Sequence, residues 1–461
     1  MTTSTHSHAT GVSPERVAAL TARERVAYAQ RNPNSKALAE RAAQHLLFGV
    51  PLHWMNDWAT PFALQVDRAQ GAHLTDVDGH QLVDFCLGDT GAMFGHAPPA
   101  VMDALRVQSA RGCTTMLSGA DACVVGEMLA DRFGLPIWQF ALSATDANRF
   151  VLRWLRAATR RKVLLVFNGC YHGTVDDVFV DLVDGQPQQR DSLLGQVHDL
   201  TQTTRVVEFN DLAALEAALA PGDVACVLAE PVMTNIGMVL PQPGFWERAI
   251  ELIHAHGSLL VMDETHTISS GPGGYARAHG LLPDAVVLGK PLGGGMPCAA
   301  YGFSAELAER VVAAKRDAPP GHSGVGTTLT ANLLAMAAMR ATLSHLMTSA
   351  VYAPMHRLTE VLADGLRTAI ARHGLPWCVS QVGARTEFQF CATPPGNGAQ
   401  AGAAMDAALE HAIHLYLLNR GVLITPFHNM MLVCPDTTES DVHLLLEAFD
   451  GALSELSAPL P

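Results

Sequence analysis

The stretch LLVMDETHTISSGPGGYARAHGLLPDAVVLGK, residues 259–290, contains two short apolar runs separated by a polar, glycine-rich segment. The first run ends at Asp263 and Glu264, and the second ends just before Lys290. Short runs rich in valine and leucine, separated by enough residues for a helix, predict parallel strands covered by helices on both faces. A lysine at the end of a buried strand costs free energy unless it has a partner or a function.

The same alternation extends outward from this stretch, with further apolar runs at 163–167 and 225–229. A mostly parallel α/β sheet is therefore expected over the middle of the chain, closed by a helix from 329 to about 346. Before it, helices are expected over 13–30 and 36–47, followed by two short strands around a turn at 78–79. The expected division is a disordered tail (1–12), an N-terminal segment that joins the small domain (13–94), a large domain (95–348) and a smaller α+β domain (349–461).

Composition excludes several classes of protein. The net charge of −14 argues against nucleic acid as a partner. No apolar run approaches the roughly 18 residues of a membrane span. Nine cysteines are scattered without a C-x-x-C pair, which favours a reducing cytoplasm and gives no sign of a metal site.

Polar side chains follow the predicted strands at the point where each strand ends. Tyr171 and His172 follow the run at 163–167, and Glu230 follows the run at 225–229. In open parallel sheets, ligands bind beyond the carboxyl ends of the strands. For one strand, a loop residue in its own ion pair is the better explanation, but four neighbouring strands together indicate a site.

The motifs present and missing indicate which cofactor this site could bind. A nucleotide hydrolase needs the loop G-x-x-x-x-G-K-[ST], which is missing, and no dinucleotide fingerprint is present. Pyridoxal phosphate needs a lysine for its aldehyde, a carboxylate for its ring nitrogen and a helix start for its phosphate. Of the four lysines, Lys36, Lys162 and Lys315 lie in polar contexts that indicate solvated charges. SATDAN (143–148) precedes a helical stretch and is a candidate phosphate site, with an ordinary helix cap as the alternative.

With these residues in place, the sequence resembles the class III aminotransferases of fold type I, and in particular the subgroup of glutamate-1-semialdehyde aminomutase and the β-amino-acid aminotransferases. The motifs that carry the resemblance are DVDGHQLVDF (76–85), CYHG (170–173), EPVMTNIGMVLP (230–241), DET (263–265), GKPLGGGMPCAAYGF (289–303), TTLTANLLAMAA (327–338) and NRGVLITP (419–426). The resemblance implies a seven-stranded, mostly parallel sheet and a small α+β domain built from both termini. It also implies pyridoxal 5'-phosphate as cofactor and a homodimer with shared active sites.

Roles follow from the resemblance residue by residue. Lys290 would bond the cofactor and Asp263 would pair with its ring nitrogen. Thr328 would reach the phosphate of the neighbouring subunit, and Thr265 stands where the family has a valine beside the ring. The other expected contacts are Ser143, Ala144 and Thr145 at the phosphate, Tyr171 stacked on the ring, Asn235 at the ring hydroxyl, and His172 and Glu230 as residues that orient their neighbours.

The expected reaction moves an amino group from an amino acid or amine to a keto acid in two half-reactions. An intramolecular aminomutase and a lyase or decarboxylase remain alternatives, and a binding protein without catalysis is a further one. The segments CYHGTVDD and GDTGAMFGH (88–96) depart from the aminomutase forms, which favours transfer between molecules.

The substrate is the least defined part. Many relatives hold a carboxylate with an arginine near positions that here read HWMNDW (53–58) and TPFHN (425–429), and neither segment contains one. Arg385 is the candidate replacement, with a solvated or structural charge as the alternative. Asp89 could accept a hydrogen bond from the donor, and Trp54 either lines the substrate site or packs in the core.

Overall fold

The computed structural model describes residues 10–457 and divides into two compact units. Unit 1 comprises residues up to Pro98 together with Ala353–Pro394 and Ala404 onward, and unit 2 comprises Pro99–Tyr352 and Pro395–Ala403. No helix within 10–457 is long and apolar enough to cross a membrane.

Unit 2 is built on a seven-stranded sheet in the order β4-β12-β11-β10-β9-β5-β8. Only β12 runs opposite to the other six strands, so the expected mostly parallel seven-stranded sheet is confirmed. Its strands are β4 (Ile137–Ala141), β5 (Val163–Phe167), β8 (Thr204–Val207), β9 (Val224–Ala229), β10 (Leu259–Asp263), β11 (Ala285–Leu288) and β12 (Ala299–Phe303). A separate hairpin pairs β6 (Val180–Val183) with β7 (Gln186–Gln189).

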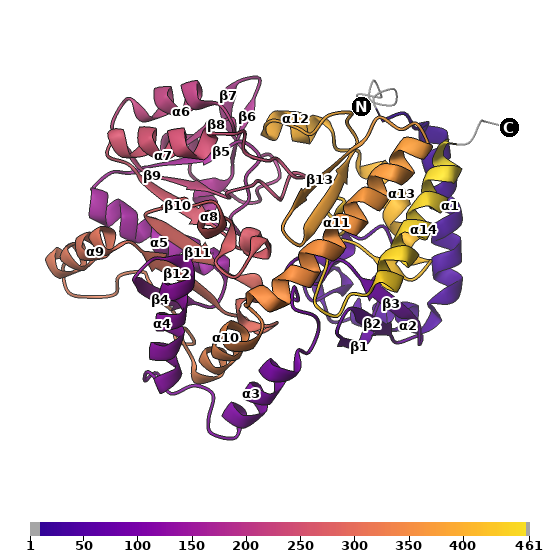
Figure 1. Ribbon diagram of the computed structural model, residues 1–461, viewed down its shortest axis with the longest axis horizontal. Helices are drawn as coiled ribbons and strands as arrows, with labels where there is room; N and C mark the ends of the chain where they lie inside the picture. The colour runs from indigo at the N-terminus through magenta and orange to yellow at the C-terminus, as the bar shows by residue number, and fades with distance from the viewer. Residues whose placement is uncertain (1–9, 458–461) are drawn as a thin grey trace. The chain divides into compact units, whose positions relative to one another are not determined.

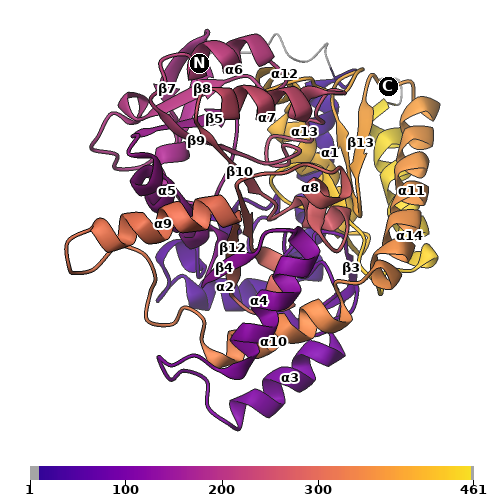
Figure 2. The same cartoon turned by 60° about the vertical axis from the view of Figure 1, so that its left-hand side comes forward.

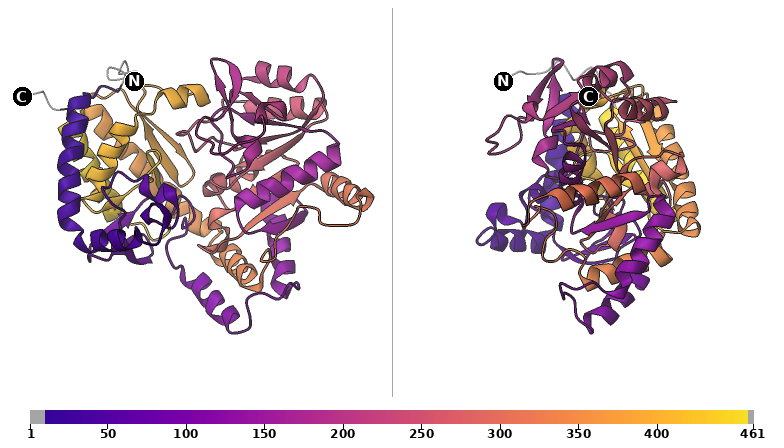
Figure 3. Two further views of the ribbon diagram at one scale, coloured as in Figure 1. Left: turned by 180° about the vertical axis from the view of Figure 1, so that it is seen from behind. Right: turned by 90° about the vertical axis from the view of Figure 1, so that its left-hand side faces the viewer.

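Helices cover both faces of this sheet. The helices of unit 2 are α3 (Pro99–Ser109), α4 (Ala120–Phe133), α5 (Ala144–Thr159), α6 (Leu212–Leu219), α7 (Phe245–Ala255), α8 (Gly274–Ala278), α9 (Ala305–Asp317), α10 (Leu333–His345) and α12 (Gly398–Ala403). Helices α5 and α9 lie side by side on one face, as Figures 2 and 3 show. Helices α6 and α7 pack on the other face (Figure 1).

Side-chain alternation along the strands explains the two layers. In β5, Leu164 and Val166 belong to the core under α5, whereas Leu165 and Phe167 belong to the core under α6 and α7. Because successive strand side chains point to opposite faces, a strand covered on both sides must be apolar at every position. This is why β5, β9, β10 and β11 read as nearly uninterrupted apolar runs in the sequence.

Unit 1 joins segments from three parts of the chain. Its helices are α1 (Pro14–Arg31), α2 (Pro33–Ala42), α13 (Ala407–Leu418), α14 (Glu439–Ser457) and most of α11 (Ser349–Arg372). Its strands are β1 (Val66–Gln70), β2 (His73–Asp76), β3 (Gln81–Asp84), β13 (Cys378–Val382), β14 (Arg385–Gln389), β15 (Val422–Leu423) and β16 (Met430–Leu432). Strand β15 pairs with β3, so one sheet contains strands from both ends of the chain.

Helix α1 begins where the sequence predicts it. The Ser13 hydroxyl accepts a hydrogen bond from the Arg16 amide at 3.3 Å, and Pro14 occupies the first turn. Two positions that we expected in a disordered tail are instead buried: Thr10, whose carbonyl accepts a bond from the Trp377 indole at 2.7 Å, and Val12. The rest of that expectation, residues 1–9, lies outside the described residues.

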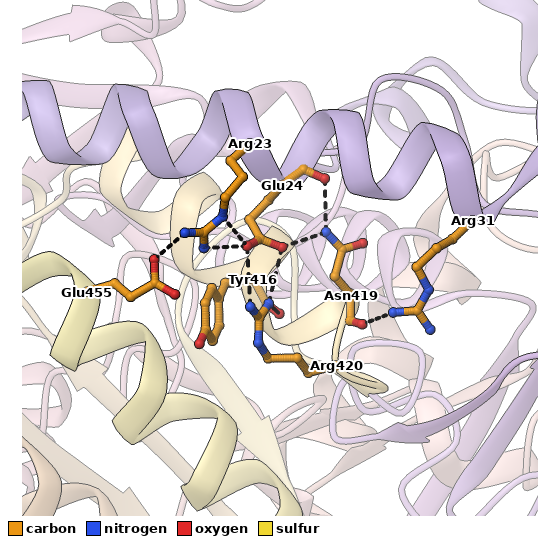
Figure 4. Close-up of polar contacts among 7 residues, drawn as sticks. All are labelled: Arg23, Glu24, Arg31, Tyr416, Asn419, Arg420 and Glu455. Atoms are coloured by element: carbon orange, nitrogen blue, oxygen red, sulfur yellow. Dashed lines mark hydrogen bonds and ion pairs between the residues drawn. The ribbon is translucent and has the colours of Figure 1, made fainter.

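A network of hydrogen bonds links α1 to Asn419 and Arg420, which follow α13, and to Glu455 on α14 (Figure 4). The buried carboxylate of Glu24 accepts hydrogen bonds from Arg23 at 2.6 Å, Asn419 at 2.8 Å and Arg420 at 3.1 Å. Burial alone would raise the pKa of Glu24, but the bonds from Arg420, Asn419 and Arg23 outweigh it and hold that pKa below its usual value. Arg23 also bonds Glu455 on α14 at 2.5 Å.

Other boundaries differ from the expectations. The second helix spans Pro33–Ala42 rather than 36–47, and the closing helix begins at Leu333 rather than 329. The short segment Pro395–Ala403 belongs to unit 2, although the sequence placed it in the small domain. There the Asn210 side chain donates a hydrogen bond to the Gly396 carbonyl at 2.8 Å. This tertiary contact could not be predicted from the local sequence.

Candidate active site

Five parallel strands of unit 2 deliver polar residues to one edge of the sheet. Ser143 follows β4, Tyr171 and His172 follow β5, Glu230 follows β9, Asp263 ends β10 and Lys290 follows β11. Because these strands are mutually parallel, their carboxyl ends meet at the same edge.

Asp263 is the most elaborately supported of these residues. Its side chain is buried, and one oxygen accepts bonds from the Asn148 amide at 2.8 Å and the His172 ring at 3.0 Å. The other oxygen accepts from the backbone amide of Thr265 at 3.0 Å. Burial would raise the pKa of Asp263, but the bond to His172 and that ring's charge, together with the other two bonds, lower it.

The neighbours of Asp263 carry unsatisfied polar atoms. Within the described chain, the Asn148 Oδ1, His172 Nε2 and Thr265 Oγ1 atoms are buried and lack a hydrogen-bond partner. Buried polar atoms in native proteins are nearly always hydrogen-bonded, so three orphans around one carboxylate indicate a ligand that completes them.

Lys290 has an unusual backbone. Its φ is 45°, a left-handed conformation that costs a non-glycine residue free energy, and Gly289 before it packs tightly on Ala144. A Cβ at Gly289 would lie 2.8 Å from the Ala144 Cβ. The Lys290 Nζ lies 2.6 Å from the His266 Nε2.

The other lysines behave as expected. Lys36, Lys162 and Lys315 are exposed, which confirms that they are solvated charges.

Two glutamates at this edge are structural supports. Glu230 accepts hydrogen bonds from Thr234 and, at 3.1 Å, from Asn235. Glu264 accepts from the Thr267 hydroxyl at 2.6 Å and from the backbone amides of Tyr275 and Ala276 at 2.7 and 2.6 Å. Burial raises the pKa of Glu264 to about 7.

The N-terminus of α5 lies at the same edge of the sheet. The Ser143 hydroxyl caps the helix by accepting from the Asp146 amide at 3.1 Å. Thr145 accepts from the Thr174 amide at 3.1 Å, and a Cβ on Gly173 would fall only 2.1 Å from the Thr145 hydroxyl oxygen. The helix N-terminus and the loop 170–174 are therefore in direct contact.

Two residues expected at the cofactor are more open. Tyr171 is 40% exposed, and Thr328 is also exposed at the surface of unit 2. An exposed ring is available to a ligand. An exposed Thr328 is available to a second subunit.

The three expected substrate residues lie in unit 1. Arg385 is fully buried in β14 and donates a hydrogen bond to the Thr90 hydroxyl, so the alternative of a solvated charge is wrong. Asp89, beside Thr90, has a left-handed backbone with φ of 49°. Trp54 and Phe427 are both partly exposed and meet edge to face with ring centroids 5.8 Å apart, which excludes simple core packing.

Sequence reasoning missed two residues. Asn148 lies inside α5, where an amide gives no signal of its partner across the sheet. His266 lies three residues beyond Asp263 at the same edge, which was a usable signal.

Comparison with known proteins gives a consistent result. Residues 54–453 match the family model described as aminotransferase class-III. The chain is 37% identical over 442 residues to a glutamate-1-semialdehyde 2,1-aminomutase of Sorangium cellulosum, covering 93% of this chain and 98% of that protein. It is 34% identical over 397 residues to the protein of the same name from Anaeromyxobacter sp., covering 85% and 90%.

Solved structures extend the comparison. A glutamate-1-semialdehyde-aminomutase from Pseudomonas aeruginosa PAO1 superimposes with a TM-score of 0.95 at 49% identity, covering 97% of this chain and all of that one. A β-phenylalanine aminotransferase from Variovorax paradoxus has a TM-score of 0.86 at 26% identity, covering 96% and 99%.

Proposed function

The chain belongs to the class III aminotransferase family, and from this membership we propose that it moves an amino group between molecules, from an amino acid or amine donor to a keto acid. The observation that supports this most strongly is that Asp263 ends β10 and Lys290 follows the adjacent parallel strand β11. The carboxylate and the amine are the two groups that the family's cofactor, pyridoxal 5'-phosphate, requires.

The residues of unit 2 fit this cofactor. Asp263 is ionised and offers an acceptor to a protonated ring nitrogen, while the first turn of α5 offers backbone amides to a phosphate. A polar ligand at this position would satisfy the orphaned atoms of Asn148, His172 and Thr265. When bound, the cofactor supplies an electron sink for the carbon from which the substrate loses a proton.

The side chains divide the remaining work. Lys290 would take the proton from the substrate carbon as a base and then return it, as an acid, on the other side of the nitrogen that is transferred. His172 and Asn148 hold Asp263 in the charged form, so its negative charge is present before the reaction begins. Glu230 fixes the amide of Asn235, which we assign to the ring hydroxyl.

An aminomutase is the second candidate, because the relatives with this name cover almost the whole chain. Both reactions use the same Lys290 and Asp263. They differ in whether the intermediate amino compound leaves the protein. The sequence departures at 88–96 and 170–177 favour transfer to a second molecule.

The need for an external acceptor separates the two. The full-length protein loaded with cofactor is given glutamate-1-semialdehyde, or a panel of amino donors, with and without pyruvate or 2-oxoglutarate. We expect sustained turnover of a donor only when a keto acid is added. Sustained isomerisation of the semialdehyde without any keto acid would establish the aminomutase instead.

Arg385 is our proposal for the residue that binds a substrate carboxylate, with Asp89 and Trp54 as further contacts. A carboxylate in a buried setting favours the two parallel N–H groups of an arginine. Replacing Arg385 by leucine should raise KM for carboxylate donors roughly 10- to 100-fold and leave simple amines such as 1-phenylethylamine little affected. The exposed Arg367→Leu is the control, and an equal loss for both donor types would make Arg385 a structural residue.

We further propose a cytoplasmic homodimer in which Thr328 completes the partner's phosphate site. The exposure of Thr328 and the free state of all nine cysteines support this. Sedimentation at assay concentration tests the assembly, since a fully active monomer is incompatible with a shared site.

A further inference from the structure

His266 stands beside the amine of Lys290, and no role is yet assigned to it. The His266 ring is buried, and its Nε2 lies 2.6 Å from the lysine Nζ. We propose that His266 is a positioning residue for Lys290: it accepts a hydrogen bond from the amine, fixes the direction of its remaining lone pair and stabilises its ammonium form.

The register of the sheet places the two side chains together. Strands β10 and β11 run parallel with Asp263 opposite Val287. His266 lies three residues beyond Asp263, and Lys290 lies three residues beyond Val287. One short segment, 263–266, therefore supplies both the carboxylate and the imidazole of the site.

The Lys290 side chain is restrained at both its Cα end and its amine end. The tight packing of Gly289 on Ala144 and the left-handed backbone of Lys290 fix the Cα end. The bond to His266 fixes the amine end. A side chain as flexible as lysine loses rotamer entropy when it is fixed, so holding it beforehand removes that cost from the reaction.

The chemistry of the pair fixes the donor. A neutral imidazole has one acceptor nitrogen and one N–H, and an amine or ammonium can donate to the acceptor. Nζ therefore donates and Nε2 accepts, which leaves the imidazole's own proton on Nδ1. The bond to an ammonium is charge-assisted and stronger than the bond to a neutral amine.

This difference matters for the activity proposed above, on which the catalytic part of the inference rests. Lys290 becomes an ammonium each time it takes a proton from the substrate carbon. An acceptor that bonds the ammonium more strongly than the amine makes Lys290 a better base at the moment of proton transfer.

A labelling experiment tests the contact without using the reaction. The full-length protein freed of cofactor, in which Lys290 is an amine, is acetylated at a series of pH values and mapped by mass spectrometry. The midpoint of the pH dependence is compared for His266→Phe, which keeps a ring but no acceptor, and His266→Gln, which keeps an acceptor. Lys36, Lys162 and Lys315 serve as internal references in the same sample.

We expect His266→Phe to lower the Lys290 midpoint by about one to two pH units, because the ammonium loses a charge-assisted bond. His266→Gln should stay within roughly 0.5 unit of the wild type, and the reference lysines should not move. An unchanged Lys290 midpoint in His266→Phe, or a raised one, overturns the proposal. If the phenylalanine variant does not fold, His266→Ala gives the same comparison.

Kinetics of the loaded protein add the second readout. His266→Phe should lower kcat roughly 10- to 100-fold with a smaller change in KM, and His266→Gln should restore most of it. If the protein proves not to transfer amino groups, the labelling result still stands, so failure of the proposed function and failure of the contact are distinguishable.

Discussion

Two carboxylates, Glu24 in unit 1 and Asp263 in unit 2, are buried and have a pKa below the usual value. In both, burial opposes the shift and hydrogen bonds overcome it. Their surroundings differ in what is left over. No buried side-chain atom of the Glu24 network in Figure 4 lacks a partner within 10–457, whereas three atoms around Asp263 do.

This difference distinguishes a structural hydrogen-bond network, at Glu24, from a candidate ligand-binding site, at Asp263. A lowered pKa reports that a charge is stabilised, and it does so equally in a structural network and in a catalytic one. Buried polar atoms without a hydrogen-bond partner, in contrast, indicate that a ligand binds there. The comparison therefore predicts that changes near Asp263 affect the reaction, and that changes at Glu24 affect folding.

The largest effect is expected at Lys290. Lys290→Ala should lose activity by on the order of 10⁴-fold or more while retaining cofactor, because Asp263 and the start of α5 remain. Borohydride reduction of the wild type followed by peptide mapping should place the pyridoxyl label on Lys290. A label on Lys36, Lys162 or Lys315 would contradict the assignment of the site.

Asp263→Asn should lower kcat roughly 10²- to 10³-fold, since the lost charge acts mainly on the charge that develops during proton transfer. Cofactor affinity, measured by equilibrium titration, should change much less. Glu24→Gln is the matched control with the same chemical change, and its kcat should stay near that of the wild type. Near-full activity of Asp263→Asn would remove the distinction between the two regions.

Glu24→Ala should destabilise unit 1 by about 2–3 kcal/mol, because three hydrogen bonds, two of them from arginines, lose their acceptor. The urea midpoint should fall accordingly. Glu455→Ala removes an exposed partner of Arg23 and should cost no more than about 1 kcal/mol. Equal losses for the two variants would show that the burial of Glu24 adds nothing.

The smallest effect is a change with pH. The folded-state pKa of Glu24 is depressed, so its contribution to stability is fully present above its ordinary value of 4.5 and is lost as pH falls through the folded-state pKa. The difference in unfolding free energy between the wild type and Glu24→Gln should therefore shrink on acidification below about pH 4.5. A difference that stays constant to pH 3 would assign the stabilisation to packing.

The sequence predicted the parts of the site that are local. Asp263 and Lys290 stand at the ends of apolar runs, and parallel strands must end at one edge. Asn148 could not be predicted in the same way, because its partner lies 115 positions away across the sheet. The burial of Arg385 beside Thr90, 295 positions away, also depends on tertiary packing that no local pattern encodes.

The division of unit 1 among three stretches of chain has a consequence for biosynthesis. Helix α1 leaves the ribosome well before its partners Asn419, Arg420 and Glu455, which are made more than 380 residues later. At about 5–20 residues per second, α1 waits roughly 20–80 seconds before the Glu24 carboxylate can meet Arg420, which follows α13. During that interval the face of α1 that packs on α13 and α14 lacks its final neighbours. The nascent chain thus carries a stretch that chaperones can bind until α13 and α14 have emerged.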